Sequence, residues 1–392
     1  MEPKLRFKEF NGDWEETQLQ NEVNIIMGQS PSSNSYNEEK IGVPLVQGNA
    51  DIKNRITSPT RYTNKPTKIC KKDSLIMTVR APVGYVGKAN QEVCIGRGVC
   101  EIQVKKCNSD YIYQFLLNKE DSWDKISQGS TFTSISSNDI KKLNINIPSL
   151  PEQTKIADFL STVDEKIQNQ QDKITHLENI KKGFMQKIFS RKIRFKDANG
   201  NEFPEWEEKK LEDTIETIID NRGKTPPISS SGYPLIEIAS MQNNGLNYRK
   251  IEKYVSDETY KTWFRNHIKA DDILFSTVGA YSGSLSYYDG KIKSCIAQNI
   301  IGLRFAQNSK FMMYLLSEKE NQKRIQNIKM NQAQPSIKVT QIIKLKFLIP
   351  CLKEQQKIAD FLSSFDEKID VEKETLEHLK ELKKGLLQQM FV

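Results

Sequence analysis

Two stretches of the chain, residues 148–193 and 350–392, place apolar residues at alternating steps of three and four. A 3.5-residue period that lasts for about five heptads is typical of a coiled-coil seam. Prolines stand at the start of both stretches, where the first turn of a helix tolerates them. The pattern therefore predicts two long helices. Their seam residues are Ile156, Leu160, Val163, Ile167, Ile174, Leu177, Phe184 and Ile188, then Ile358, Leu362, Phe365, Ile369, Leu376, Leu379, Leu386 and Met390.

The apolar stripe of each predicted helix is wider than a two-helix seam requires. Polar residues interrupt the seam at Gln170, Lys181, Glu372 and Lys383, and the stripe is widened by Phe159, Ile180, Phe361 and Leu382. Such a stripe needs a further cover, which predicts a protein partner. The residues expected to serve the coiled coil and this partner are Ile156, Phe159, Leu160, Val163, Ile167, Ile358, Phe361, Leu362, Phe365 and Ile369. Two ordinary amphipathic core helices are the alternative, although five heptads exceed the usual helix of about 11 residues.

The other two stretches, residues 1–147 and 194–349, combine short strand patterns with helical ones. Residues 43–47, 74–79, 98–104, 234–239, 273–278 and 299–305 are expected to form strands, and residues 110–118 and 309–326 helices. This mixture predicts an α+β module in each stretch. The domain order is then a module at 1–147, a helical spacer at 148–193, a module at 194–349 and a second spacer at 350–392.

A long internal repeat relates the two halves of the chain. Residues 148–189 align with 350–391 without a gap, and both copies contain Leu-x-Glu-Gln-x-Lys-Ile-Ala-Asp-Phe-Leu. The modules match more faintly, at Trp14 with Trp206, Gly28-Gln-Ser-Pro31 with Gly223-Lys-Thr-Pro226, Thr78-Val79 with Thr277-Val278, and Ser134-Ile135 with Ser336-Ile337. The period is far too long for a solenoid repeat. It indicates duplication of a half-protein whose modules diverged while the helices were retained.

Charge and composition narrow the classes of function. The net charge is +8, and the excess lies mainly in the two modules, which favours a polyanionic partner. The six cysteines form no Cys-x-x-Cys pair and lie far from the three histidines, so we expect free thiols and no metal site. The chain contains no Walker loop and no Asn/Asp-Pro-Pro-Tyr/Phe loop like that of adenine methyltransferases. We expect a cytoplasmic protein without a membrane span, a signal peptide or a catalytic site of its own.

Candidate contacts to a polyanion are polar and basic residues in the loops of each module. Arg, Lys, Asn and Gln match the edges of bases and the phosphates in their geometry. The candidates in the first module are Gln47, Asn49, Lys53, Arg55, Arg61, Ser130 and Thr131. Those in the second module are Met241, Gln242, Asn243, Arg249, Lys250, Gln332 and Gln334. Ordinary solvated loop residues are the alternative interpretation for each of them.

The order of module, Leu-x-Glu-Gln-x-Lys-Ile-Ala-x-Phe-Leu helix, module and the same helix resembles the specificity subunits of type I restriction-modification enzymes over essentially the whole chain. Glu152-Gln153 and Glu354-Gln355 look like that family's conserved regions, and the Gly-x-Ser/Thr-Pro motifs look like the openings of its target recognition domains. The resemblance implies that each module reads one half of a split site on double-stranded DNA. It also implies that the helices pair antiparallel, hold the modules apart and dock two modification subunits, which restriction subunits would join.

The resemblance assigns all chemistry to the partners. S-adenosylmethionine, ATP and Mg²⁺ would belong to them, and this chain would need no cofactor. A helix of about 38 residues is about 57 Å long, enough for two readers to reach major-groove sites about 34 Å apart. Because the modules have diverged, the two half-sites should differ. A coiled-coil scaffold with protein- or carbohydrate-binding modules and a subunit of a methylation-only complex are the alternatives.

Overall fold

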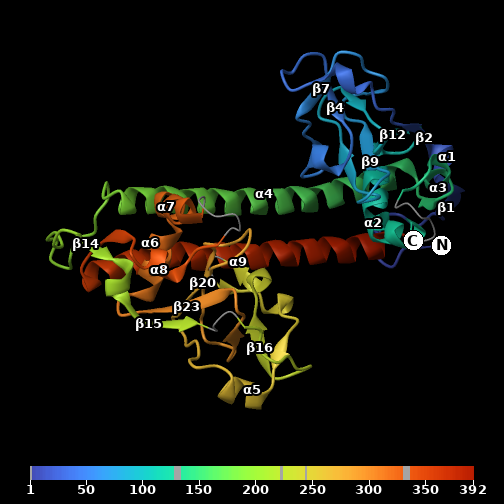
Figure 1. Cartoon of the computed structure of the whole chain (residues 1–392). Helices are drawn as coiled ribbons and strands as arrows, with labels where there is room; N and C mark the ends of the chain where they lie inside the picture. The colour runs from blue at the N-terminus through green and yellow to red at the C-terminus, as the bar shows by residue number, and fades with distance from the viewer. Residues whose placement is uncertain (1, 128–133, 221–223, 243–244, 330–335) are drawn as a thin grey trace. The chain divides into compact units, whose positions relative to one another are not determined.

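The computed structural model (Figure 1) describes residues 2–127, 134–220, 224–242, 245–329 and 336–392. The chain divides into two compact units. Unit 1 contains residues 1–171 and 374–392, and unit 2 contains residues 172–373. Each unit therefore combines one globular module with part of each long helix. Within the described ranges no helix is both long and apolar enough to cross a bilayer.

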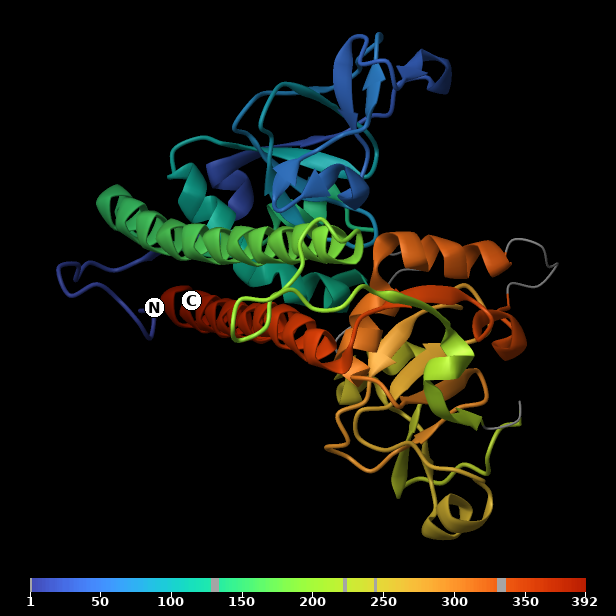
Figure 2. The same ribbon diagram turned by 90° about the vertical axis from the view of Figure 1, so that its left-hand side faces the viewer.

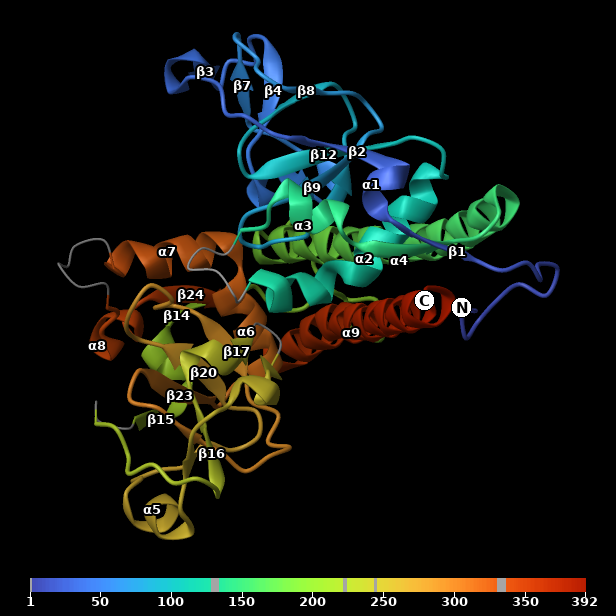
Figure 3. The same cartoon turned by 90° about the vertical axis from the view of Figure 1, so that its right-hand side faces the viewer.

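The module of unit 1 is built on two sheets. In the first, the strand order is β2(Val23–Met27), β12(Val99–Val104), β9(Leu75–Thr78), β10(Val86–Lys88), β6(Ile56–Thr57) and β5(Ile52–Lys53). In the second, it is β3(Tyr36–Asn37), β7(Arg61–Thr63), β4(Val43–Val46), β11(Val93–Ile95) and β8(Ile69–Cys70). A separate ladder joins β1(Glu15–Gln18) to β13(Asn144–Ile147), and the helices are α1(Leu19–Glu22), α2(Ser109–Ser127) and α3(Ser137–Lys141). Apolar residues of α2 belong to the same core cluster as residues of β2, β9, β10 and β12. Figure 3 shows the elements of this module from the side.

The module of unit 2 repeats this plan in reduced form. Its main sheet has the order β15(Ile215–Asp220), β23(Ile300–Phe305), β20(Ile273–Ser276) and β21(Leu285–Tyr287), the counterpart of β2, β12, β9 and β10. A second sheet joins β19(Tyr254–Val255), β16(Tyr233–Ile236) and β22(Cys295–Ile296), and two pairs join β14(Glu207–Lys210) to β24(Lys346–Ile349) and β17(Met241–Gln242) to β18(Gly245–Leu246). The helices are α5(Asp257–Thr262), α6(Ser309–Ser317), α7(Lys319–Lys329) and α8(Val339–Ile342). The parallel pair β4–β11 recurs as β16–β22, which confirms two similar α+β modules.

Three details differ from the sequence prediction. The helix predicted over residues 309–326 is two helices, because Glu318 is extended and its carboxylate accepts the N–H groups of Glu320 at 2.8 Å and Asn321 at 3.0 Å. The helix expected over residues 110–118 continues to Ser127. The predicted match of Thr78-Val79 with Thr277-Val278 is wrong by one residue, because Thr78 pairs with Val99 as Ser276 pairs with Ile300.

The two predicted spacers are long helices, α4(Leu150–Phe189) of 40 residues and α9(Leu352–Met390) of 39 residues (Figure 1). Every predicted seam residue is described, and each one is buried or half-buried. The partners run in opposite directions within unit 2, where Lys173 pairs with Glu372 and Lys181 with Asp366. The predicted antiparallel pairing of the helices is therefore present.

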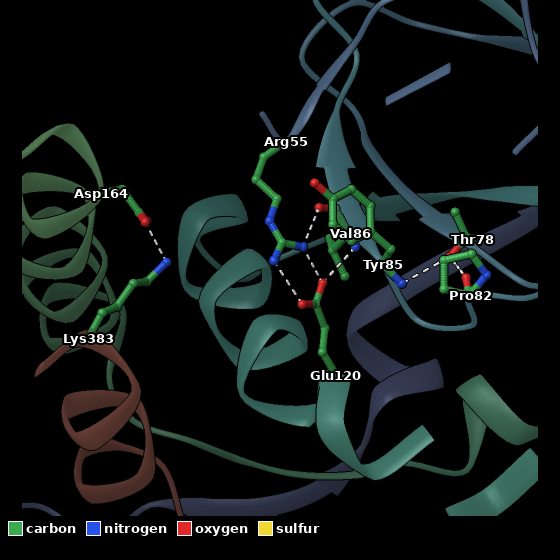
Figure 4. A network of polar contacts seen from close by, with 8 residues as sticks. All are labelled: Arg55, Thr78, Pro82, Tyr85, Val86, Glu120, Asp164 and Lys383. Carbon is green, nitrogen blue, oxygen red and sulfur yellow. Dashed lines mark hydrogen bonds and ion pairs between the residues drawn. The ribbon is translucent and has the colours of Figure 1, made fainter. Parts of the chain in front are cut away.

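Ion pairs occupy the two lysine interruptions of the seam. In unit 2, Lys181 pairs with Asp366, and both side chains are 12% exposed. In unit 1, the equivalent Lys383 pairs with Asp164 (Figure 4). Burial lowers the pKa of the Lys383 ammonium below its ordinary value, while Asp164 acts in the opposite direction. Each of these two lysines therefore has a carboxylate partner on the opposite helix.

The retained Glu-Gln motif fastens each helix to its own module. In unit 1, Glu152 accepts hydrogen bonds from Arg6 at 2.8 and 2.9 Å and from the Trp14 indole at 3.3 Å. Its neighbour Gln153 accepts the backbone N–H of Asn108 at 2.9 Å and donates to the Pro148 carbonyl at 2.9 Å. These bonds explain why both motif residues are buried, at 2% and 4% exposure.

Unit 2 repeats this arrangement bond for bond. Glu354 accepts from Arg194 at 3.0 and 3.3 Å and from the Trp206 indole at 3.1 Å. Gln355 accepts the backbone N–H of Asn308 at 3.1 Å. The hydrogen bond with Glu354 raises the pKa of the Arg194 guanidinium above its usual value. The Glu-Gln motif is therefore retained in both copies because it connects the long helix to the module within each unit.

Two short segments, one at the beginning of the chain and one after α4, cover part of the widened apolar stripe. In unit 1 the Leu5 N–H donates to the Gln389 carbonyl at 2.9 Å, and the Phe7 ring meets Phe159 with centroids 5.8 Å apart. In unit 2 the segment after α4 returns past α9 (Figure 2), and Phe195 meets Phe361 at 5.5 Å. The two segments therefore correspond to each other. In unit 1 the beginning of the chain contacts the start of α4, and in unit 2 the segment after α4 contacts the start of α9.

Candidate nucleic-acid interface

The Gly-Gln-Ser-Pro loop of the first module is fixed against the turn that precedes β12. The Gly28 N–H donates to the Val99 carbonyl at 3.0 Å. A Cβ atom on Gly28 would lie 2.1 Å from the Gly96 carbonyl oxygen, so only glycine fits there. Two residues on, the Ser30 hydroxyl accepts the backbone N–H of Arg97 at 3.1 Å. The motif therefore supports the surface that is formed by this loop and the turn before β12.

That surface is an open hollow of about 620 Å³. A hydrogen-bonded chain runs along it, because the Gln47 amide donates to the Tyr36 hydroxyl at 2.9 Å and this hydroxyl donates to the Pro31 carbonyl at 3.1 Å. The Asn49 side-chain oxygen is buried and has no hydrogen-bond partner in the described part of the chain. Of the described residues that line the hollow, two are arginines and none is acidic. The hollow suits a polar, anionic ligand.

The two arginines of the hollow, Arg80 and Arg97, were not among the sequence candidates. Both are exposed, and no ion pair or hydrogen bond holds either guanidinium within the described ranges. Arg97 stands between Gly96 and Gly98, and Arg80 lies two residues beyond the end of β9. Two sequence signals could have identified them. Arg97 lies in a Gly-Arg-Gly turn next to a buried strand, and Arg80 follows shortly after the end of a second buried strand.

The candidates of the first module have different positions. Gln47 and Asn49 line the hollow, so two predicted residues are brought together with the arginines. Lys53 is exposed at the end of the β5–β6 hairpin, and Arg61 is exposed on β7. Ser130 and Thr131 lie outside the described residues.

Arg55 is engaged inside the module (Figure 4). Its guanidinium forms a two-pronged pair with the Glu120 carboxylate, donates to the Val86 carbonyl at 3.1 Å and stacks 4.1 Å from the centre of the Tyr85 ring. Glu120 also accepts the Val86 N–H at 2.9 Å. Arg55 therefore joins the β5–β6 hairpin to β10 and α2 and is not part of the proposed interface.

The candidates of the second module are partly at the surface. Gln242 is exposed at the end of the β17–β18 hairpin, whereas Met241 is half-buried against the core. Arg249 and Lys250 are exposed on the short turn η5(Tyr248–Lys250). Asn243, Gln332 and Gln334 lie outside the described residues.

The hollow of the first module has a backbone counterpart in the second. Gly96 donates to Val46 as Ala297 donates to Ile236, and Val79 donates to Gly98 as Thr277 donates to Asn299. Both frames also end in an isolated bridge, Arg80 to Ser134 and Val278 to Ser336. In this register Val278 takes the place of Arg80, and Gln298 takes that of Arg97. The frame is shared, but the side chains differ.

The predicted partner-binding residues lie largely inside the units. Ile156, Leu160, Val163, Ile358, Leu362 and Ile369 are buried, and Ile167, Phe361 and Phe365 are half-buried. Phe159 is 38% exposed beside Phe7. Exposed apolar residues on the same helices include Val371 at 59% and Leu382 at 54%. Over the described ranges, no three His, Cys, Asp or Glu side chains gather as metal ligands would.

The model of the type I restriction modification DNA specificity domain matches the chain twice, at residues 11–179 and 204–381. The chain belongs to this family. The MjaX specificity subunit of Methanocaldococcus jannaschii is 37% identical over 197 residues, which are 49% of this chain and 46% of that protein. The type I restriction enzyme MjaVIII specificity subunit of the same organism is 23% identical over 97% of this chain and 94% of its own length.

Solved structures agree with this assignment at the level of fold. The type I restriction-modification S subunit of M. genitalium has a TM-score of 0.59 and 19% identity, and the match covers 100% of this chain and 99% of that one. The specificity-domain family thus accounts for the duplicated modules and the two long helices, and the two family matches begin and end close to the two halves of the repeat.

Proposed function

We propose that this chain is the DNA sequence-recognition subunit of a type I restriction-modification complex, in which each module reads one half of a bipartite site. The observation that carries the proposal is the double match to a DNA specificity domain, together with a cationic hollow on the first module whose counterpart on the second differs in chemistry. The family match gives no support to a scaffold with protein- or carbohydrate-binding modules.

The two modules share one backbone frame and differ in the side chains mounted on it, so the two half-sites should differ in sequence. The site would then not be a palindrome. α4 and α9 would act as a spacer, because a helix of 40 residues is about 60 Å long. Docked modification subunits would supply methylation with S-adenosylmethionine, and restriction subunits would add ATP- and Mg²⁺-dependent cleavage, so this chain would bind none of these cofactors.

Exposed apolar residues of the helices, such as Val371 and Leu382, would contribute to the contact with two modification subunits. The seam residues would act indirectly, by holding the helices together. This replaces the simpler expectation that the whole widened stripe meets the partner, since Phe159 and Phe361 already contact Phe7 and Phe195.

Exchange of a module tests the proposal. The full chain, in complex with its modification subunit, is compared with a chimaera in which residues 1–147 come from another family member. Sequencing of methylated adenines should show a change in one half of the site and none in the other. A change in both halves, or methylation without sequence preference, would contradict independent reading by the two modules.

Salt dependence gives a second readout of the same proposal. Exposed Lys and Arg side chains must displace counterions from phosphate, so log affinity should fall linearly with log salt. Replacing Arg249 and Lys250 together with alanine should lower affinity for all sequences alike and reduce the slope by about two. A dissociation constant that does not depend on salt would argue against DNA as the ligand.

A further inference from the structure

The hollow of the first module presents two guanidinium groups that have no partner of their own among the described residues. Arg80 and Arg97 line it together with Gln47 and Asn49, and within the described ranges neither arginine is held by an ion pair or a side-chain hydrogen bond. A guanidinium offers two parallel donors, which match the O6 and N7 acceptors of guanine in the major groove. A phosphate group would accept the same pair of donors, so the comparison with the second module and the selection experiment below distinguish a base from a phosphate.

The second module offers different chemistry at the same places. Val278 replaces Arg80 and Gln298 replaces Arg97, on a backbone with equivalent hydrogen bonds. The nearby Glu237 is paired with Lys253 at 2.8 Å. Two cations have therefore become an apolar side chain and an amide. An amide pairs with adenine, and an apolar side chain contacts the methyl group of thymine.

We infer that Arg80 and Arg97 are specificity-determining residues that read guanine in the half-site of the first module, and that the second module needs no guanine at the corresponding position. The inference rests on the proposed function, because it assigns a base to one of the two readers. It predicts that at least one guanine in the first half-site depends on at least one of these side chains.

Selection from a duplex library with randomised positions tests this inference. The full chain in complex with its modification subunit is compared with Arg80→Ala and Arg97→Ala. We expect at least one variant to lose the preference for guanine at one position of the first half-site, by roughly ten- to a hundredfold. The second half-site should stay unchanged. Lys72→Ala is the matched control, since Lys72 is exposed in the same module and does not line the hollow.

The outcomes separate this inference from the proposed function. A wild-type complex that selects no sequence contradicts the proposed function itself. A bipartite site whose first half contains no guanine, or whose guanine preference survives both substitutions, overturns only the assignment of Arg80 and Arg97. An equal loss on all sequences would mean phosphate contact and would also overturn it. Arg80→Gln and Arg97→Gln keep the side-chain bulk and serve where alanine alters thermal unfolding.

Discussion

Removing the Lys181 ammonium should destabilise unit 2 more than removing any exposed charge from the same helix does. Lys181 and Asp366 are each 12% exposed, and the Tyr314 hydroxyl donates to the same carboxylate at 2.6 Å. Lys181→Met keeps most of the aliphatic chain but removes this cation from the buried Asp366 carboxylate, to which the Tyr314 hydroxyl still donates. Breaking a buried ion pair from one side costs about 3–5 kcal/mol. Because Tyr314 remains, we expect about 3 kcal/mol.

Two matched variants and one assay resolve this effect. Lys182→Met removes an exposed charge from the neighbouring position and should change stability by less than about 0.5 kcal/mol. Lys181→Met combined with Asp366→Asn removes the buried charge altogether and should recover most of the loss. For a unit of about 200 residues, 3 kcal/mol corresponds to a decrease in Tm of roughly 6–12 °C. Hydrogen exchange of peptides from residues 172–189 assigns the change to unit 2.

Equal stability of Lys181→Met and Lys182→Met would refute the reasoning. It would mean that Lys181 is solvated in the molecule and that the ion pair does not set the register of the helices. Failure of Asp366→Asn to restore stability would also contradict it, because the cost would then not arise from an unpaired buried charge.

Three further predictions concern the spacer, the Glu-Gln motif and the buried thiols. Four residues inserted between Gln168 and Asp172 lengthen α4 by about 6 Å. Methylation sequencing should then show that the gap between the two half-sites is longer by one or two base pairs, with both half-sites unchanged. An unchanged gap with full activity would mean that the helices do not set the spacing. Glu354→Gln should lower the free energy of unfolding by about 3 kcal/mol, because Arg194 loses its buried partner, whereas Glu207→Gln, at a side chain that is 72% exposed, should have little effect in the same urea titration. Burial raises the pKa of the Cys100 thiol to about 12, above an unfolded value of about 8.5. The contribution of this thiol to the free energy of unfolding is therefore full below pH 8.5 and is lost as pH rises toward 12. Tm should fall over that range, and it should fall less steeply in Cys100→Ala.

The helices were predictable because one period controls them. Ile156, Leu160 and Ile358 are buried as the heptads require, and Lys181 and Lys383 interrupt the seam where the sequence placed polar residues. The break at Glu318 was not predictable from periodicity. The apolar residues of α6 and the amphipathic pattern of α7 continue in one helical phase, and only the carboxylate cap on the following N–H groups separates them.

The sequence predicted a polar and basic interface in the loops of each module, but it predicted only some of the residues that form it. Gln47 and Asn49 were found by residue type, and they line the hollow. Arg55 has the same residue type, yet Glu120 holds it inside the module. Residue type cannot separate a free guanidinium from an engaged one, because the partner is 65 positions away in the chain. Arg80 and Arg97 were missed for the related reason that the fold brings their two turns together.

Selection of DNA by the unaltered chain tests the central claim most directly. The full chain in complex with its modification subunit is presented with duplexes that carry randomised positions, and the bound molecules are sequenced. The account predicts one enriched site with two different half-sequences separated by a gap of fixed length. No enrichment, a palindromic site or half-sites at variable separation would contradict it.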